Sequence, residues 1–380
     1  MAGSAELGQI AAKAADDLID RFPAFVSATG PDRELVGVAL SGMARAGLFD
    51  LGYLRFDADR ISAEDMKRAV SVVAALAARS LSLTTIYMVN AIFGGAFVAQ
   101  MATSQQKRDV LPAIREGRLQ LAFAMTEPDA GSDASAIATQ AVATGQGFLL
   151  SGEKIFTTGA SSADYILVVA RNSGDEKRAV SLFLVPGDAE GVSIEPLARV
   201  SANAHASCRM AMRDVRLGPK QLLGGPERLG KAWPIMRVSG SLERIVVAAT
   251  AAGLADAIIV RALSFAKERR QFGQSLVSFQ SLQHLLVEMR TAHVGMGLFI
   301  EHALRMLAEG EPEQAASMAK YHCAEQLQEI VAKGMRIMGG RAFFSFEQMS
   351  RYYCEAPFSL YAGGTAEIQK NLIARSMGIG

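Results

Sequence analysis

One nine-residue segment, residues 125–133, concentrates groups that could bind a polar ligand. It contains two hydroxyls, three carboxylates, a proline and a glycine, directly after the largely apolar residues 119–124. Pro128 fixes its own φ angle, and Gly131 can adopt backbone conformations that other residues avoid. A constrained loop of this kind presents N–H groups and hydroxyls, so the pattern predicts a binding loop on a scaffold.

A carboxylate that could act as a base lies in residues 238–255, where Glu243 and Arg244 are the only charged residues. Nearly all the others are small or apolar, so the predicted helix should be buried around most of its circumference. A partly desolvated glutamate has a raised pKa, which suits proton abstraction near neutral pH. The alternative is a buried ion pair, for which Arg244 is a poor partner because adjacent residues on a helix point in different directions. The pattern alone leaves both roles open.

Two further segments could bind anions. Residues 266–273 contain Arg269 and Arg270, which could recognise phosphate, although a helix C-terminus capped by Gly273 explains the pattern equally well. Residues 361–368 place a double glycine before Thr365 at the predicted start of a helix. Such helix N-termini bind anions or polar ligand edges, and the alternative is a simple capped turn.

The elements that position these groups fall into three regions. Residues 5–118 have helical periodicity, a series of short β-type runs follows from about residue 120, and the chain is helical again from Pro234. We expect a long helix to about Arg270, followed by helices near residues 279–308, 312–338 and 365–377, as in a four-helix bundle. The predicted fold class is α+β multidomain, with an N-terminal α-helical domain (1–119), a middle antiparallel β domain (120–228) and a C-terminal α-helical bundle (229–380).

Local signals predict where several elements begin and end. Gly47 should end one helix, and Ser62 with Asp65 should begin another. Residues 145–147 predict a hairpin turn, because they lack the third glycine of a dinucleotide-binding fingerprint and precede a strand-like run. Residues 172–174 and 186–188 predict further turns between strands.

Composition excludes several classes of function. The net charge is +1, so nothing indicates a nucleic-acid partner, and no secretion signal is visible at the N-terminus. The longest uninterrupted apolar run, residues 245–255, is shorter than the roughly 18 residues of a membrane span. Three scattered cysteines suit a reducing compartment, so we expect a cytoplasmic protein. We expect no metal site, since His284, His293 and His302 recur every nine residues and scatter around a helix.

These segments, in this order, resemble the FAD-dependent acyl-CoA dehydrogenase family across nearly the whole chain. The family's first signature matches residues 124–133 without a break, and residues 153–158, 268–273, 280 and 364–369 match later motifs. The resemblance implies an oxidoreductase that acts on the CH–CH group of an acyl thioester, carried by CoA or by an acyl-carrier protein. It also implies an electron-transfer flavoprotein as a possible acceptor and a homo-oligomer, dimer or tetramer, with FAD at subunit interfaces.

The resemblance also assigns roles to individual residues. It places five residues around the flavin ring, with Thr158 near N5: Phe123, Met125, Thr126, Phe156 and Thr158. Gly131 and Ser132 would lie near the ring edge or the mouth of the thioester site. Three residues would hold the FAD of a neighbouring subunit, with Arg269 at the pyrophosphate: Arg269, Phe272 and Gln280. Four more would contact the adenine half or the ribityl chain: Gly339, Gly340, Thr365 and Glu367. Substrate contacts would come from Ser132, Arg244, Tyr361 and Gly363.

The chain departs from the common family pattern at the catalytic position. Gly363 stands where the catalytic glutamate usually lies, and a glycine cannot act as a base. A branch resembling isovaleryl- and long-chain acyl-CoA dehydrogenases carries this glutamate on the long C-terminal-domain helix, just before an arginine, as Glu243 and Arg244 do here. We therefore expect Glu243 to remove the pro-R α-proton while flavin N5 accepts the β-hydride. The Gly363 amide could hydrogen-bond the thioester carbonyl.

Other departures favour a specialised member of the family. Arg336 replaces a usual glutamine and could reach an FAD phosphate or ribose, and Ala342 replaces a usual glycine. Two alternatives stay open at this stage. One is a flavin oxidase or monooxygenase on the same scaffold, against which Glu243 counts. The other is a non-catalytic FAD-binding relative.

Overall fold

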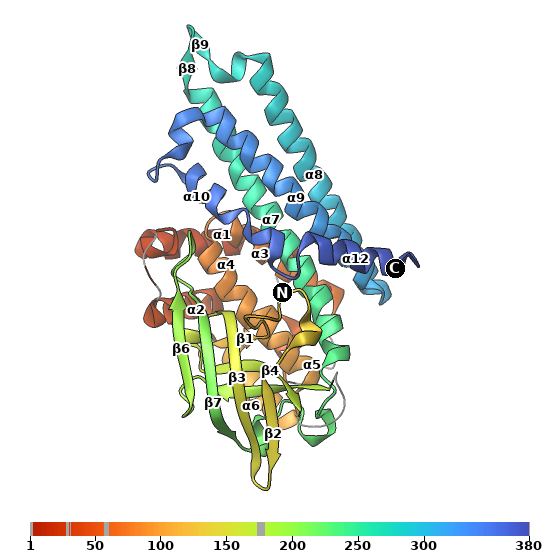
Figure 1. The fold of residues 1–380 in the computed structure, drawn as a ribbon. Helices are drawn as coiled ribbons and strands as arrows, with labels where there is room; N and C mark the ends of the chain where they lie inside the picture. Colours follow the sequence, from red (N-terminus) through yellow and green to blue (C-terminus); the bar gives the residue numbers. More distant parts are fainter. Residues whose placement is uncertain (1–2, 28–29, 31, 57–60, 173–178, 380) are drawn as a thin grey trace. The chain divides into compact units, whose positions relative to one another are not determined.

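The computed structural model describes residues 3–27, 30, 32–56, 61–172 and 179–379. Helices come first, strands follow, and helices return, as the sequence predicted (Figure 1). The chain forms two compact units. The first, here called the sheet unit, comprises residues 13–65 and 82–240. The second, the helical unit, comprises residues 1–12, 66–81 and 241–380. The domain boundaries expected after residues 119 and 228 stay predictions, because the N-terminal helices are divided between both units.

The sheet unit is built on seven strands. Their bounds are β1 (Leu121–Ala124), β2 (Gln140–Thr144), β3 (Gly147–Thr158), β4 (Tyr165–Asn172), β5 (Val180–Pro186), β6 (Val192–Leu197) and β7 (Ser207–Leu217). The order is β1-β4-β2-β3-β7-β6, with β5 paired to β4. The prediction of an antiparallel sheet was wrong for two pairs, since β4 runs parallel to both β1 and β2. Residues 166–170 of β4 are all buried, as is typical of strands covered on both faces.

Several helical segments of the sheet unit precede β1 along the chain. They are α2 (Arg33–Arg45), α4 (Leu81–Met88), the π-helix η3 (Val89–Gly95), α5 (Ala96–Met101) and α6 (Ser104–Arg115). Asn90 in η3 accepts a hydrogen bond from the Leu121 N–H at 2.9 Å. A Cβ on Gly94 would lie 2.4 Å from the Leu121 side chain, so glycine permits this approach. The packing places the ring of Phe97 on that of Phe123, with centroids 5.0 Å apart.

Most of the local sequence signals are confirmed. Gly47 follows the end of α2 with φ of +74°, and the Ser62 hydroxyl accepts a hydrogen bond from the Asp65 N–H at the start of α3 (Ala63–Ala77). Residues 145–146 form the turn between β2 and β3, and β5 ends at Pro186. The turn predicted at residues 172–174 lies partly outside the described residues.

The helical unit contains three long helices and one shorter one at the predicted places (Figure 1). They are α7 (Trp233–Glu268), whose first turns belong to the sheet unit, α8 (Gln280–Glu309), α9 (Pro312–Met338) and α12 (Ala366–Ser376). The short helices α10 (Gln348–Glu355) and α11 (Phe358–Tyr361) were not anticipated. Part of α3 packs against α7, where a Cβ on Gly253 would lie only 2.1 Å from the Ala74 carbonyl oxygen.

The segment after α7 is not a glycine-capped helix end, so that interpretation of Gly273 was wrong. The helix ends at Glu268, and a hairpin of β8 (Arg270–Gln271) and β9 (Gln274–Ser275) follows. Phe272 and Gly273 form its turn with φ of +52° and +79°. Two left-handed residues in a row are typical of a two-residue hairpin loop.

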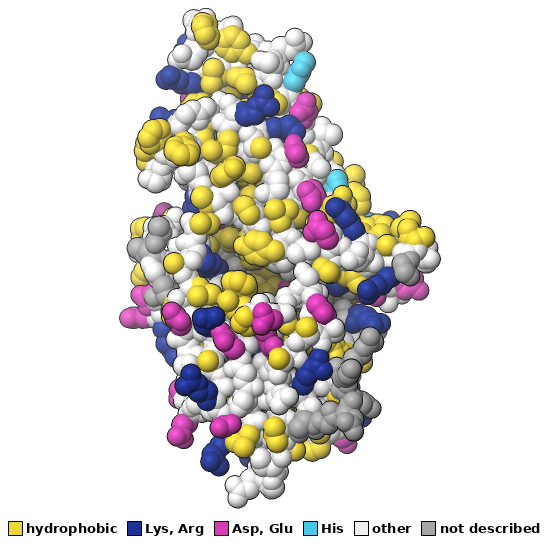
Figure 2. Space-filling model, viewed as in Figure 1, with side chains coloured by type: hydrophobic (Ala, Val, Ile, Leu, Met, Phe, Trp, Pro, Cys, Tyr) yellow, Lys and Arg dark blue, Asp and Glu magenta, His cyan; other side chains and the backbone are white. Residues whose placement is uncertain are grey.

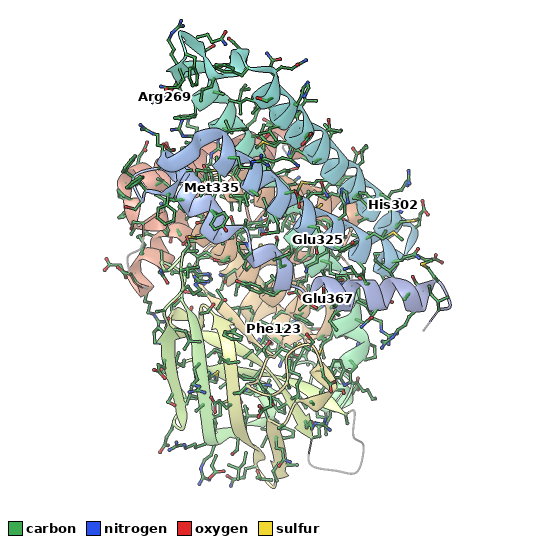
Figure 3. All side chains as sticks on the ribbon, turned by 45° about the horizontal axis from the view of Figure 1, so that its top comes forward. Phe123, Arg269, His302, Glu325, Met335 and Glu367 are labelled. Carbon is green, nitrogen blue, oxygen red and sulfur yellow. The ribbon has the colours of Figure 1, made fainter. Side chains whose placement is uncertain are left out.

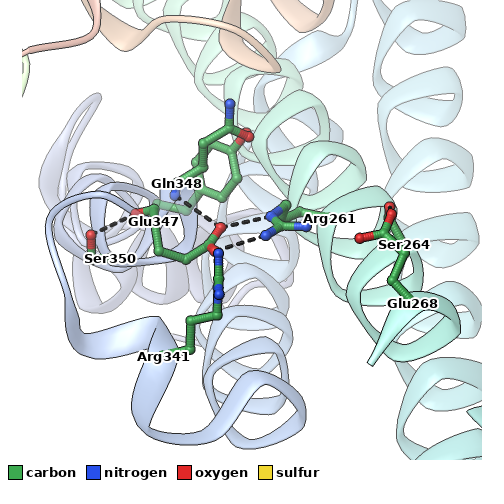
Figure 4. A network of polar contacts seen from close by, with 8 residues as sticks. Arg261, Ser264, Glu268, Arg341, Glu347, Gln348 and Ser350 are labelled. Carbon is green, nitrogen blue, oxygen red and sulfur yellow. Dashed lines mark hydrogen bonds and ion pairs between the residues drawn. The ribbon is translucent and has the colours of Figure 1, made fainter. Parts of the chain in front are cut away.

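An ion-pair network around the buried Glu347 ties α7 to the segment that follows α9 (Figure 4). Glu347, only 4 % exposed, accepts hydrogen bonds from Arg261 Nε at 2.6 Å and from Arg341 Nε at 3.0 Å. Hydrogen bonds from the arginines outweigh burial and lower the pKa of Glu347. The network therefore fixes the irregular chain between α9 and α10 onto the long helix.

Two helical stretches, Leu81–Met101 and Trp233–Glu268, are long and apolar enough to cross a membrane by length and composition. Their most apolar windows are 94 % and 78 % buried within the structure. Burial of this extent is typical of helices that form the core of a folded unit.

Candidate active site

The loop at residues 125–133 is held from beneath by a buried ion pair within the sheet unit. Lys154 on β3 is fully buried, and its Nζ donates to Glu127 Oε1 at 2.7 Å and to the Met125 carbonyl at 3.0 Å. Burial lowers the pKa of Lys154 to about 8, partly opposed by Glu127. Glu127 and Lys154 lie in two separate sequence motifs, and only the fold shows that one supports the other.

Glu127 fastens the other end of the loop as well. Its carboxylate accepts hydrogen bonds from the backbone N–H groups of Ala138 at 2.6 Å and Thr139 at 2.9 Å, and from the Thr139 hydroxyl. Burial alone would raise the pKa of Glu127, but these donors and Lys154 outweigh it and lower the pKa. Glu127 is therefore structural, and its ionised form holds the loop.

The same loop carries four of the predicted cofactor residues. Met125 and Thr126 are half-buried, whereas Gly131 and Ser132 are exposed. The Thr126 carbonyl accepts from the Ile155 N–H at 2.9 Å, which ties the loop to β3. Thr158 at the end of β3 shares a hydrogen bond of 2.8 Å with Ser207 on β7, a neighbour that the sequence did not indicate.

Phe156 has an unusual conformation for an apolar residue. Its side chain is 64 % exposed, and its φ of +59° is left-handed. A left-handed backbone costs an L-residue about 1–2 kcal/mol, and such outliers cluster at functional sites. Exposing a large aromatic ring from a strained position suits stacking with a flat aromatic ligand.

In the helical unit, Glu243 lies against the double-glycine turn. A Cβ on Gly363 would be 3.5 Å from Glu243 Cγ and 3.8 Å from Cδ. The Glu243 side chain therefore occupies the space toward which a side chain at position 363 would point. Burial raises the pKa of Glu243, and Arg244, Lys320 and a hydrogen bond from the Gly363 backbone oppose part of this rise.

Arg244 does not neutralise Glu243 through a full ion pair. Its Nε and Nη1 are buried, and no group among the described residues forms a hydrogen bond with them. Burial lowers the pKa of Arg244, while the charges of Glu243 and Glu313 raise it. These two donors of Arg244 therefore do not hydrogen-bond Glu243, which agrees with the expectation that Arg244 is a poor partner for a buried ion pair.

The turn at residues 363–364 leads into a capped helix, as predicted. Gly363 and Gly364 have φ of +68° and +93°, which explains why both are glycines. The Thr365 hydroxyl accepts from the Ile368 N–H at 3.3 Å and caps α12. Thr365 is half-buried, and Glu367 and Tyr361 are exposed nearby along the chain.

The remaining predicted cofactor residues lie at the other end of the helical unit. Figure 3 shows Arg269 at the hairpin end of α7 and Glu367 at the opposite end. Arg269 is 26 residues from Glu243 along a continuous helix up to residue 268, which corresponds to about 39 Å. This end carries six predicted residues, all exposed: Arg269, Phe272, Gln280, Arg336, Gly339 and Gly340. The expected contacts of Gly339, Gly340, Thr365 and Glu367 with the adenine half or the ribityl chain of FAD stay predictions.

Comparison with known proteins decides the family. Residues 122–215 match the family model described as "Acyl-CoA dehydrogenase, middle domain", and residues 231–378 match "Acyl-CoA dehydrogenase, C-terminal domain". A 3-(aryl)acrylate reductase of Clostridium sporogenes is 33% identical over 291 residues, which cover 76% of this chain and 76% of that protein. The chain belongs to the acyl-CoA dehydrogenase family. It is an oxidoreductase of that family with the corresponding three-part fold.

Two further relatives extend the comparison of this acyl-CoA dehydrogenase family member. Subunit CarC of the caffeyl-CoA reductase-Etf complex of Acetobacterium woodii is 30% identical over 309 residues, covering 78% of this chain and 79% of that protein. The solved butyryl-CoA dehydrogenase from Megasphaera elsdenii superimposes with a TM-score of 0.90 at 23% identity, covering 98% of this chain and 97% of that one. The likeness to butyryl-CoA dehydrogenase shows the fold alone.

FAD is the cofactor of this family, and the sheet unit fits it. A flat flavin ring needs an aromatic or apolar face together with polar groups at its edge. Exposed Phe156 supplies the first, and Thr126, Ser132 and Thr158 of the same unit supply hydroxyls. The ion pair beneath the loop keeps these groups in place.

Proposed function

We propose that this protein is an FAD-dependent dehydrogenase of acyl thioesters in which Glu243 removes the α-proton. The observation that carries the proposal is a buried carboxylate beside the Gly363 turn, in the space where the usual family glutamate would project. When bound, FAD supplies the chemistry of accepting the hydride from the β-carbon.

The residues of the chain have separate tasks in this proposal. In the sheet unit, Phe123, Met125, Thr126, Phe156 and Thr158 would hold the flavin ring, with Gly131 and Ser132 at its edge. In the helical unit, Glu243 takes the proton at its carboxylate oxygen, and Arg244, Tyr361 and Gly363 contact the substrate. Desolvation raises the proton affinity of Glu243, which makes it a stronger base than an exposed glutamate.

Replacing Glu243 by glutamine tests this role. The substitution removes the base and retains the shape of the side chain. We expect substrate-dependent bleaching of the flavin under anaerobic conditions to slow by about 10²–10⁴-fold, the usual contribution of general base catalysis. Flavin absorbance and bound FAD content should match the wild type. Bleaching at an undiminished rate would remove Glu243 from the mechanism.

The acyl group and the direction of reaction can be tested together. Two relatives are named as an arylacrylate reductase and as a subunit of a caffeyl-CoA reductase-Etf complex, which favours a 3-arylpropionyl or arylacrylyl group here. Titration with 3-arylpropionyl, straight-chain and branched thioesters, each on CoA and on a carrier protein, should bleach the flavin with its preferred substrate. The reverse assay supplies reduced electron-transfer flavoprotein, the proposed redox partner, with an arylacrylyl thioester. Rapid reoxidation by oxygen after bleaching would instead favour the oxidase, and a flavin that no thioester bleaches would favour a non-catalytic relative.

We further propose a homo-oligomer, dimer or tetramer, in which the hairpin end of each helical unit serves the FAD of a neighbour. The separation of about 39 Å between Glu243 and Arg269 supports this, because both are expected to serve an FAD. Hydrophobic side chains are exposed on the helical unit (Figure 2), and Val287, Val294 and Leu298 of α8 are each more than half exposed on one face. Sedimentation analysis of the wild type and of Val294→Glu tests the assembly. A monomeric wild type with full FAD content would contradict it.

We also propose that the protein is cytoplasmic. Cys208, Cys323 and Cys354 are all free thiols in the structure, which suits a reducing compartment. Fractionation of cells with detection of the native protein tests the location, and recovery outside the cytoplasm would overturn it.

A further inference from the structure

A buried lysine lies beneath the double-glycine turn of the helical unit. Lys320 on α9 is fully buried, and its Nζ donates hydrogen bonds to the carbonyl of Leu360 at 2.9 Å and to that of Gly364. Within the described residues no carboxylate forms a salt bridge with it. Burying an ammonium group without such a partner is costly, so its position requires a physical reason.

A neutral side chain already holds the same turn. Gln369 on α12 is fully buried and donates from Nε2 to the carbonyls of Gly363 at 2.9 Å and Gly364 at 3.1 Å. Hydrogen bonding to the turn can therefore be supplied without charge. What Lys320 adds to the turn is a positive charge in a buried environment, where charge acts over a longer range than in water.

The charge of Lys320 acts on Glu243. Lys320 Nζ bonds the Gly364 carbonyl, and a Cβ on the adjacent Gly363 would lie 3.5 Å from Glu243 Cγ, so the turn links the two side chains. The charges of Arg244 and Lys320 and a hydrogen bond from the Gly363 backbone lower the pKa of Glu243 against the effect of burial. The charge of Glu313 also acts on Arg244 and raises its pKa. Burial lowers the pKa of Lys320 to about 8, a shift that Glu243, Glu325 and Glu367 oppose and Arg244 reinforces. Lys320 is thus still protonated at neutral pH.

We propose that Lys320 is a positioning residue whose charge favours the ionised form of the Glu243 carboxylate while it fixes the turn that carries Gly363. The proposal rests on the proposed role of Glu243 as the base. It adds a separate electrostatic role for a residue that touches neither substrate nor cofactor in the proposed function.

Lys320→Met tests the charge, and Gln369→Met is the matched control. Both remove donors to the Gly364 carbonyl, but only the first removes a charge. The rate of anaerobic flavin bleaching is measured against pH for each holoenzyme. We expect its acid limb to move to higher pH by about one unit in Lys320→Met, as when a nearby opposite charge is lost, and to stay in place in Gln369→Met. An acid limb at the same pH in the wild type, Lys320→Met and Gln369→Met would overturn the electrostatic role. So would an acid limb that shifts equally in both variants. If Lys320→Met does not fold, Lys320→Gln removes the same charge and retains a donor.

A second measurement does not depend on turnover. Because the pKa of Glu243 is raised by folding, its contribution to stability is present below its unfolded pKa and is lost as pH rises through its folded pKa. The difference in melting temperature between proteins with Glu243 and with Glu243→Gln reports that titration. In the Lys320→Met background, we expect the contribution of Glu243 to stability to be lost at higher pH than in the wild type. If Glu243→Gln bleaches normally, the proposed function fails, whereas an unchanged titration in Lys320→Met overturns the inference about Lys320 alone.

Discussion

Lys154→Met should strongly destabilise the sheet unit. Lys154 is fully buried, Glu127 is 6 % exposed, and their atoms are 2.7 Å apart. Removing one partner of a buried pair leaves the other charge unpaired, which costs about 3–5 kcal/mol. The Met125 carbonyl also loses its donor. Since domains are stable by about 5–15 kcal/mol in total, this loss is a large fraction.

The assay is urea unfolding followed by the fluorescence of Trp233, the single tryptophan, which lies within the sheet unit. The control is Arg33→Met, which breaks the exposed pair with Asp164 and should cost at most about 1 kcal/mol. The double variant Lys154→Met/Glu127→Gln should lose much less than the sum of the two single variants, because neither charge is then left alone. A Lys154→Met protein within about 1 kcal/mol of the wild type would refute the reasoning, since only solvated pairs are that weak.

Three further predictions concern packing, pH and strain. Gly253→Ala should lower the melting temperature, because the new methyl group meets the Ala74 carbonyl, whereas Gly297→Ala, in open space on α8, should raise stability by about 0.5–1 kcal/mol. The pKa of Glu347 is lowered, so its contribution to stability is present above the ordinary glutamate pKa and is lost as pH falls. The melting temperatures of the wild type and Glu347→Gln should therefore converge in acid. A difference in melting temperature that stays constant with pH would contradict this. Phe156→Gly should relieve the left-handed backbone strain without lowering the melting temperature of the FAD-free protein. It should also weaken FAD binding in a fluorescence titration, and an unchanged FAD affinity would count against a stacking role of Phe156.

The long elements were predictable because their signals are local. The apolar circumference of residues 238–255 indicated a buried helix, and α7 covers this region. Ser62 with Asp65 marked a helix start, and Thr365 marked another, since a capping hydroxyl acts on N–H groups only three residues away. Strand direction was not predictable in the same way. The parallel pairing of β4 with β1 and β2 depends on partners distant in sequence.

The hairpin after α7 illustrates a local signal that was interpreted wrongly. Basic residues followed by Gly273 suit a helix C-terminus, but the same glycine also suits a two-residue turn. The left-handed conformation of Phe272, with its side chain 92 % exposed, distinguishes the two in the structure. Propensity scales do not predict a left-handed conformation for an exposed phenylalanine.

The sequence by itself indicated the family through a resemblance and offered Glu243 as the candidate base. Motif order and the absence of a side chain at Gly363 left Glu243 as the carboxylate able to replace the usual one. Only the tertiary structure decided what surrounds these residues: Lys154 beneath Glu127, and Lys320 and Gln369 holding the turn beside Glu243. The physical reason is that a motif records which groups are present, whereas desolvation and charge depend on neighbours that the fold brings from other segments. The proton affinity of Glu243 is therefore a property of the folded helical unit and not of its sequence neighbours.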